Sequence, residues 1–294
     1  MVNGPMRRLG AQGPALVILA LLCQEVGASF AILVFPVAGP VGMVAIRLWF
    51  SAIVLWILVR PKLRGLSPAA WRTVLGYGLV LTAMNLTFYL SLERLPLGTA
   101  VTIEVLGPLA LSVITGRRWL SLLWALVAFG GVMLLSWQPN AEPLDPIGVG
   151  FALAAAVMWA SYILMTKRTT EHFSGMTGFT LGMTVGAIVV TPLAAATTGA
   201  SLFEPNVLLI GIAIALLSSA IPYGLEMRAL RVLPASTFSV LLALAPAIAA
   251  LTGAIVLQQH LTLAAYLGIA LVTLAGIGAV RARRSLEQSV EEAP

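Results

Sequence analysis

The chain has 294 residues and contains few of the residues that common catalytic chemistries use. Cys23 is its single cysteine, which excludes an internal disulfide and a zinc site made of several thiolates. Asp145 is its single aspartate, which excludes a catalytic pair of aspartates. The two histidines, His172 and His260, fall in expected loops and lack the spacing of metal ligands.

Motifs for nucleotide hydrolysis and acyl transfer are also missing. The sequence has no phosphate-binding loop with its lysine, and no Gly-x-Ser-x-Gly turn that would present a nucleophilic serine. We therefore expect no enzyme, no metal and no cofactor. The net charge of +6 does not indicate a nucleic-acid partner, because the basic residues occur in short clusters between apolar segments.

What the chain does contain is apolar sequence in long runs. Apolar residues make up 60% of it and charged residues 10%, whereas soluble domains carry about 25% charged residues. Runs of about 20 apolar residues recur, and a helix of that length crosses the hydrocarbon core of a bilayer. We therefore expect an all-α integral membrane protein with ten transmembrane helices. They are placed at residues 14–34, 40–59, 71–92, 96–115, 119–137, 146–166, 176–198, 206–229, 234–257 and 262–280.

The basic residues are distributed unevenly between the two sides of the membrane. Fifteen of the 17 lysines and arginines fall on one side, which holds the residues before the first expected helix, every second loop after it and the C-terminal tail. Arg94 lies on the opposite side, and Arg47 falls inside the second helix. Cytoplasmic loops carry an excess of Lys and Arg, so both termini are expected in the cytoplasm.

The two halves of the chain resemble each other. Pro96 opens the fourth helix and Pro234 the ninth, and twelve residues later each helix contains a second proline, Pro108 or Pro246. Because five helices are an odd number, a second copy must enter the membrane from the opposite side, as in the inverted repeats of secondary transporters. Chance similarity between apolar helices is the alternative. The expected divisions are a first five-helix repeat at 1–138, a second at 139–281 and a cytoplasmic tail, expected to be disordered, at 282–294.

Four ionisable residues lie within the expected helices. A charge inside the bilayer is costly, so each of them is expected to have a functional or structural role. Glu25, Arg47 and Glu104 fall near mid-depth, and Glu226 falls close to the cytoplasmic surface. Either mid-depth glutamate would suit a substrate ammonium group or a transported proton, and Arg47 would suit a carboxylate. A buried ion pair that only fixes helix register is the alternative. Glu226 fits a gate or an interfacial ion pair.

Polar and aromatic side chains add further candidates for the lining of a binding site. A site for a small zwitterion needs a few such groups among apolar walls. Packing, or a belt of aromatic residues at the membrane surface, is the alternative for each aromatic one. With Arg47 and Glu104, the expected substrate-binding residues are Asn85, Tyr89, Trp159, Tyr162, Ser219 and Tyr223.

Close helix packing is indicated in the seventh expected helix. Gly182 and Gly186 are four residues apart and therefore lie on one face. Small residues at this spacing let two helices approach closely.

Ten helices in two inverted repeats resemble the drug/metabolite transporter superfamily and its EamA-type domain pair, over nearly the whole chain. Within it, the sequence is most similar to the bacterial threonine/homoserine exporter (RhtA-type) branch. The residues that carry this likeness lie at 46–48, 88–91, 95–98, 103–104, 107–109 and, most specifically, 217–227. Many EamA domains carry Gly-Glu between their fourth and fifth helices. The second repeat of this chain departs from that pattern, because it has Gln258 and Gln259 at this place. Glu25 also stands where an uncharged polar residue is common.

The resemblance implies an exporter of small amino acids in the bacterial inner membrane, driven by proton exchange with alternating access. It implies that Arg47, Glu104, Tyr223 and Glu226 are functionally important, and we assign proton coupling to Glu25 and Glu104. The expected partners are an amino-acid substrate, protons and the lipid bilayer, with the chain a monomer or weak dimer. The alternatives are export of aromatic amino acids or other small metabolites, and a non-transporting membrane subunit or enzyme.

Overall fold

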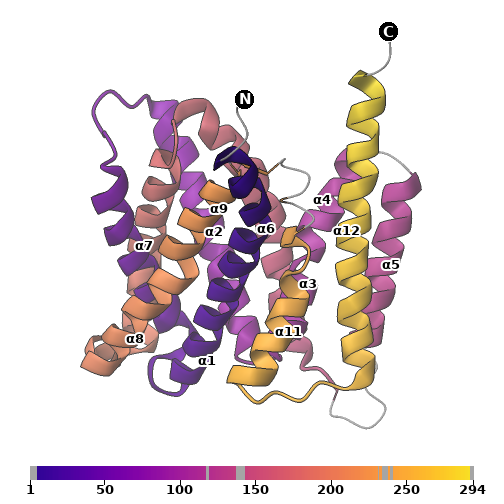
Figure 1. The fold of residues 1–294 in the computed structure, drawn as a ribbon. Coiled ribbons are helices and arrows are strands. Elements are labelled where there is room, and N and C mark those ends of the chain that lie inside the picture. The colour runs from indigo at the N-terminus through magenta and orange to yellow at the C-terminus, as the bar shows by residue number, and fades with distance from the viewer. Residues whose placement is uncertain are drawn as a thin grey trace. The chain divides into compact units, whose positions relative to one another are not determined.

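The structure is a computed structural model that describes residues 5–116, 119–136, 143–230, 232–233, 238 and 241–291. Helices dominate this part of the chain, and it contains no β-strand. The α-helices are α1 (Pro5–Val59), α2 (Pro68–Leu92), α3 (Leu97–Glu104), α4 (Leu106–Gly116), α5 (Trp119–Ser136), α6 (Pro146–His172), α7 (Thr177–Thr197), α8 (Pro205–Ala215), α9 (Ile221–Leu230), α11 (Ala245–Val256) and α12 (Leu263–Glu291) (Figure 1). A 3₁₀ helix, η1 (Gly199–Phe203), precedes α8, and a π-helical turn, η2 (Leu216–Ala220), joins α8 to α9.

Several of these helices are long and apolar enough to cross a bilayer. Five such segments occur among the described residues, at Gly13–Val59, Pro68–Leu92, Pro146–His172, Thr177–Thr197 and Pro205–Glu226. Apolar side chains that would face lipid stand exposed on them, for example Ile57 and Leu58 on α1 and Ile188 on α7. Shorter apolar helices cover Leu97–Leu111, Ala245–Val256 and Leu263–Gly278. The all-helical membrane architecture is thereby confirmed, whereas the count of ten and the inverted repeat stay predictions.

Several of the expected helices have different boundaries in the structure. The first two run together as α1, but Gly39 has φ 63° and ψ 166°, so the helical path is broken at this residue. A positive φ costs glycine little, which makes it suitable for such a break. The segment 206–229 is divided by the π-helical turn η2. The tail expected to be disordered is helical as far as Glu291, because no glycine or proline lies between Gly278 and Glu291 to stop α12.

The two prolines that defined the repeat follow similar interruptions. Pro108 has no N–H and cannot donate to the carbonyl of Glu104, four residues earlier, and the helix breaks at Val105 between α3 and α4. Pro246 follows a turn at residues 243–244, directly before α11 begins. Both helices are therefore interrupted just before the matching proline.

The chain divides into two compact units. The first comprises Met1–Val26, Pro96–Leu144 and Ile221–Pro294, and the second Gly27–Leu95 and Asp145–Ala220. Each unit combines segments from both predicted repeats.

In the second unit, α2 packs against α6 and α7. A Cβ added to Gly182 would lie 2.5 Å from a ring carbon of Tyr77, and one added to Gly186 would lie 2.6 Å from Oγ1 of Thr82. Both glycines are on α7, and both of the residues they face are on α2. The close contact expected at this glycine pair is confirmed.

Two tryptophans of α1 form hydrogen bonds with threonines of α7 in the same unit. Trp49 Nε1 donates to Thr191 Oγ1 and Trp56 Nε1 donates to Thr184 Oγ1, each at 2.8 Å. The two tryptophans are seven residues apart on α1, and the two threonines are seven residues apart on α7. The pairs follow each other in opposite order along the two helices. An indole N–H has no water to bond in a membrane interior, so these bonds fix the register of α1 against α7.

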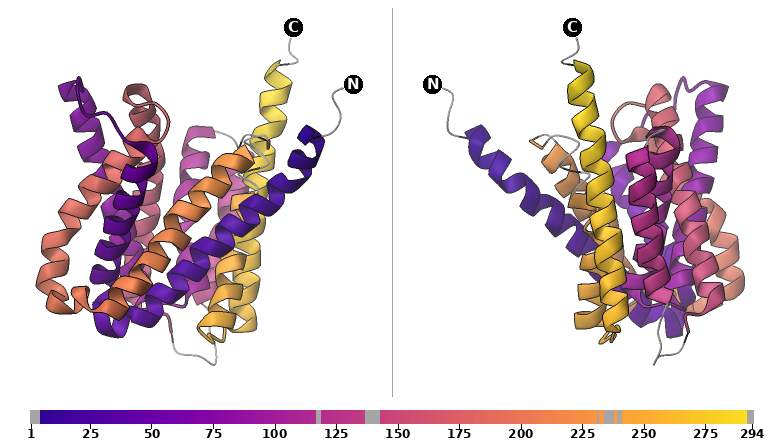
Figure 2. Two further views of the ribbon diagram at one scale, coloured as in Figure 1. Left: turned by 60° about the vertical axis from the view of Figure 1, so that its left-hand side comes forward. Right: turned by 90° about the vertical axis from the view of Figure 1, so that its right-hand side faces the viewer.

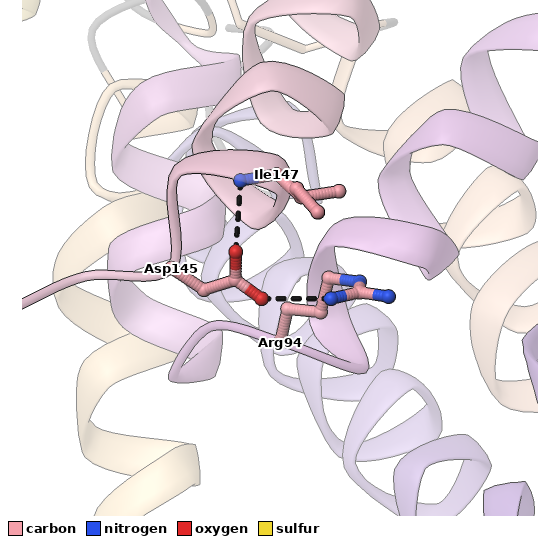
Figure 3. A network of polar contacts seen from close by, with 3 residues as sticks. All are labelled: Arg94, Asp145 and Ile147. Carbon is pink, nitrogen blue, oxygen red and sulfur yellow. Dashed lines mark hydrogen bonds and ion pairs between the residues drawn. The ribbon is translucent and has the colours of Figure 1, made fainter.

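An ion pair in the second unit links the segment that follows α2 to the residue that precedes α6. Asp145 caps α6, because its Oδ1 accepts the N–H of Ile147 at 2.8 Å, while its Oδ2 accepts from Arg94 Nη1 at 2.8 Å (Figure 3). The Arg94 guanidinium and the Ile147 N–H lower the pKa of Asp145. A carboxyl whose pKa is depressed on folding adds stability above its unfolded pKa, about 3.9, and this contribution is lost as pH falls through the folded pKa.

Replacing Asp145 with asparagine should therefore remove the ion pair and keep the helix cap, since asparagine caps as well as aspartate. We expect a small fall in melting temperature at pH 7 in detergent, which narrows as the pH approaches 3 and as salt is added. Asp145→Ala, which also loses the cap, should melt lower than Asp145→Asn at both pH values. A difference in melting temperature between wild type and Asp145→Asn that stayed constant from pH 7 to pH 3 would contradict this account.

In the first unit, α3 packs against α11 and α5 against α12 (Figures 1 and 2). A Cβ added to Gly98 would lie 2.7 Å from Cα of Ala250, so α3 and α11 touch almost backbone to backbone. The side chain of Gln259 accepts the N–H of Leu97 through Oε1 at 3.1 Å, at the start of α3. Gln259 thus supplies an acceptor oxygen to the N-terminus of α3.

The neighbouring residue, Gln258, has a strained backbone conformation. Gln258 has φ 53°, the left-handed region, where a non-glycine residue is destabilised by about 1–2 kcal/mol. Gln258→Gly should therefore raise the free energy of unfolding by about 0.5–1 kcal/mol, after the greater flexibility of glycine in the unfolded chain is subtracted. Thermal melts in detergent would measure this gain. Gln258→Ala keeps a Cβ and should show no comparable rise, so equal gains in both variants would argue against backbone strain.

Candidate functional site

Arg47, on the second half of α1, lies at the centre of a polar cluster in the second unit. Its Nη1 donates to the hydroxyl of Tyr89 and its Nη2 donates to the carbonyl oxygen of Ser218, each at 3.3 Å. The guanidinium carbon lies 5.6 Å from the centroid of the Tyr89 ring, within the range of a cation–π contact. Both hydrogen-bond acceptors are neutral, so neither compensates the charge of Arg47.

The charge of Arg47 has no partner of opposite sign within its own unit. No carboxylate oxygen among the described residues of that unit lies within 4.0 Å of it, and its buried Nε has no hydrogen-bond partner. A cation removed from water without a counter-ion is costly. The arrangement therefore leaves a guanidinium that an anionic group would stabilise.

The carbonyl that Arg47 contacts is available because of the local helix geometry. Ser218 lies in η2, and the residue four positions later is Pro222, which has no N–H to donate to it. π-helical turns inside α-helices occur frequently at functional sites. Sequence reasoning did not single out this carbonyl, although a proline four residues downstream was the signal that could have found it.

Tyr89 and Asn85 hold the α2 side of the cluster. Tyr89 is fully buried, and its ring centroid lies 5.9 Å from that of Phe35 on α1. Asn85 is buried one turn earlier, where its Nδ2 donates to the carbonyl of Leu81 at 2.8 Å. The two residues predicted to share a face are thus both on the buried side of α2.

Two adjacent serines of η2 differ in their bonding. Ser219, one of the expected site residues, receives a hydrogen bond from the hydroxyl of Ser51 at 2.9 Å. Ser218 is 7% exposed, and its Oγ is buried without a hydrogen-bond partner. The unsatisfied hydroxyl therefore belongs to the residue whose carbonyl contacts Arg47.

The two aromatic candidates on α6 are placed differently. Tyr162 stacks on Tyr77 of α2, with ring centroids 5.3 Å apart and planes 24° apart. Trp159 is half-buried. The contact of Tyr162 is thus part of the packing between α2 and α6, which was the alternative considered for it.

Both mid-depth glutamates belong to the first unit and are buried there. Glu25 on α1 is 7% exposed, and Glu104, the last residue of α3, is 9% exposed. Glu104 immediately precedes the break before Pro108, so its carboxyl stands at an interrupted point of the helix.

Glu226 on α9 is bonded to a residue that sequence reasoning missed. Its Oε1 accepts a hydrogen bond from Gln24 Nε2 at 2.9 Å, in the first unit. Among the described residues Glu226 forms no ion pair, and the gate or interfacial ion pair considered for it stays a prediction. The side chain of Tyr223, another expected site residue, lies outside what the structure describes.

Comparison with known proteins decides the family. The model of the EamA-like transporter family matches residues 146–281. The chain is 36% identical to the "Threonine/homoserine exporter RhtA" of Salmonella typhimurium (strain LT2), over 94% of each protein. It is 34% identical to the protein of the same name from Escherichia coli (strain K12), over 98% of each. The chain is a member of the EamA-like transporter family.

A solved crystal structure supports the fold of this EamA-like transporter. It is 17% identical, has a TM-score of 0.61, and the match covers 94% of this chain and 99% of the other. Membership in the family, together with the apolar helices, makes the protein a multi-pass inner-membrane transporter and not an enzyme.

The searched part of the EamA-like transporter offers no site for a metal. No group of three or more His, Cys, Asp or Glu side chains that could hold an ion occurs among the residues described. Its polar chemistry is instead that of a guanidinium, hydroxyl groups and single buried carboxyls, which can bind organic ions and carry protons.

Proposed function

We propose that this transporter exports threonine, homoserine or related small amino acids from the bacterial cytoplasm. The proposal includes exchange for protons, through a binding site that opens in turn to either side of the membrane. The names of relatives that match almost the whole chain support the substrate class. The chemistry of the buried polar groups supports a zwitterion.

The Arg47 guanidinium carries this proposal. The guanidinium is held by two neutral acceptors, Tyr89 Oη and Ser218 O, and no carboxylate oxygen among the described residues of its own unit lies within 4.0 Å of it. A planar guanidinium binds a carboxylate with two parallel hydrogen bonds, and every amino-acid substrate brings a carboxylate. Tyr89 packs against the guanidinium and limits its movement, so the group is oriented before the substrate arrives.

Proton coupling is assigned to the two buried glutamates, Glu25 and Glu104. A carboxyl in an apolar surrounding can exchange a proton with modest changes of environment, and it can also hold a substrate ammonium group when ionised. Glu226, bonded to Gln24, is proposed as the gate. The Gln24–Glu226 bond must break if α1 and α9 separate at this point.

Topology is part of the proposal: ten helices in two inverted repeats, with both termini in the cytoplasm. The distribution of Lys and Arg between the expected loops supports it. The interruptions before Pro108 and Pro246 support the repeat. Reporter enzymes fused after Gln138 and after Arg284 should report opposite compartments, and two reporters on the same side would rule the arrangement out.

A panel of toxic amino-acid analogues tests the substrate class. Cells that overexpress the protein should tolerate analogues of threonine and homoserine at higher concentration than cells with an empty vector. They should also lower their internal threonine faster after loading with a threonine-containing dipeptide. Tolerance to aromatic analogues alone would favour export of aromatic amino acids, and no tolerance or efflux of any amino acid would reject the proposal.

A further inference from the structure

Building on the proposed function, we propose that Ser218 is the specificity residue of the site. Its side-chain hydroxyl binds the hydroxyl of the substrate side chain, while Arg47 binds the substrate carboxylate. The transporter would thereby prefer hydroxy amino acids to aliphatic amino acids of the same shape.

The first observation is the unsatisfied hydroxyl itself. Ser218 is 7% exposed and its Oγ has no partner, whereas a buried polar group without a hydrogen bond costs about 1–3 kcal/mol. Buried hydroxyl groups on α2 avoid this cost by donating to a carbonyl of the preceding turn, as Thr82 does to Gly78 and Ser91 does to Phe88. Ser218 lies in a π-helical turn and makes no such bond. Its hydroxyl is therefore available to a ligand.

The second observation is the position of this hydroxyl relative to Arg47. The Ser218 carbonyl oxygen lies 3.3 Å from Arg47 Nη2, and covalent geometry keeps a serine hydroxyl within about 5 Å of its own carbonyl oxygen. Arg47 Nε, the other unsatisfied polar atom of this cluster, belongs to the same guanidinium. A donor for a carboxylate and a partner for a hydroxyl thus lie within the length of one small amino acid.

The third observation is the close packing of the Ser218 hydroxyl against Gly27. Gly27 of α1 faces Ser218, and a Cβ built on this glycine would overlap Ser218 Oγ. The absence of a side chain at Gly27 therefore leaves room for the hydroxyl. The neighbouring Ser219 accepts a hydrogen bond from Ser51 of the same unit, so the two serines of η2 are not equivalent.

Threonine and valine provide the test, because valine replaces the threonine hydroxyl with a methyl group of nearly the same size. Purified protein in proteoliposomes would be assayed for uptake of each labelled amino acid in exchange for internal threonine. A site that hydrogen-bonds a substrate hydroxyl discriminates strongly against an analogue that lacks it. We expect wild-type protein to favour threonine, and Ser218→Ala to lower the threonine-to-valine ratio at least about tenfold.

Ser91→Ala is the matched control, because Ser91 is a buried serine of the same unit whose hydroxyl is already bonded to Phe88. It should leave the threonine-to-valine ratio at the wild-type value. The melting temperature of Ser218→Ala should equal or exceed that of wild type, since the substitution removes an unsatisfied group. Equal losses of threonine and valine transport in Ser218→Ala, or an unchanged ratio, would overturn the role of Ser218. If wild-type protein exchanges neither amino acid, the proposed function itself fails.

Discussion

Replacing Arg47 with glutamine is expected to abolish amino-acid export while the protein still reaches the membrane. Glutamine can still donate one hydrogen bond but carries no charge for the substrate carboxylate. Truncating one partner of a buried charge pair costs about 2–5 kcal/mol, which corresponds to at least about a thirtyfold loss of substrate affinity. Binding of labelled threonine to the purified variant would measure the loss of affinity. Export of threonine by cells that carry the variant would measure the loss of transport.

A charge-preserving variant separates carboxylate binding from general electrostatics. Arg47→Lys keeps the positive charge but loses the forked geometry that reaches both Tyr89 Oη and Ser218 O. We expect it to bind threonine less tightly than wild type but better than Arg47→Gln. Undiminished threonine binding by Arg47→Gln would show that Arg47 does not meet the substrate, and a purely structural role would then explain its half-buried position.

Replacing Glu104 with glutamine is expected to uncouple transport from the proton gradient. The substitution keeps the size of the side chain and removes its titration. Proteoliposomes with an imposed pH gradient should therefore lose at least about tenfold in gradient-driven threonine accumulation. Exchange of external for internal threonine needs no net proton movement and should continue. This pattern, loss of one activity with retention of the other, is the signature of a coupling residue.

Glu93→Gln provides the control, because Glu93 is an exposed glutamate at the end of α2. It should accumulate threonine like wild type across the same pH gradient. If Glu104→Gln accumulated threonine normally, proton coupling would have to be sought at Glu25. If it lost accumulation and exchange together, a role in substrate binding or in the fold would explain Glu104 better than coupling.

The sequence predicted the helices well because a bilayer restricts what a chain can do. A run of apolar residues long enough to cross the hydrocarbon core must form a helix there, so run length alone identifies α2, α6 and α7. The interruptions were harder to predict. Gly39 and η2 depend on which neighbours satisfy the local backbone, and run length carries no information about that.

The sequence indicated which polar and charged residues to consider for the site, but not which residues they contact, and the roles assigned to them stay predictions. Arg47 and Tyr89 were identifiable because an arginine inside a membrane helix needs a reason, and a buried tyrosine hydroxyl needs a partner. The partners of Glu226 and Ser219 were not identifiable. Gln24 and Ser51 lie far from them in sequence, and a polar residue inside an apolar run does not reveal which distant residue it meets.

The paired tryptophan–threonine bonds between α1 and α7 have a consequence for how this family can vary. Losing one threonine alone would leave an indole N–H without an acceptor among apolar side chains, which is costlier than losing both groups together. In relatives, Trp56 and Thr184 should therefore be replaced together, and so should Trp49 and Thr191. A pair of phenylalanine and valine, for example, could take the place of a tryptophan and its threonine. An alignment deep enough to measure covariation should show these two couplings between α1 and α7, each at the same helical offset.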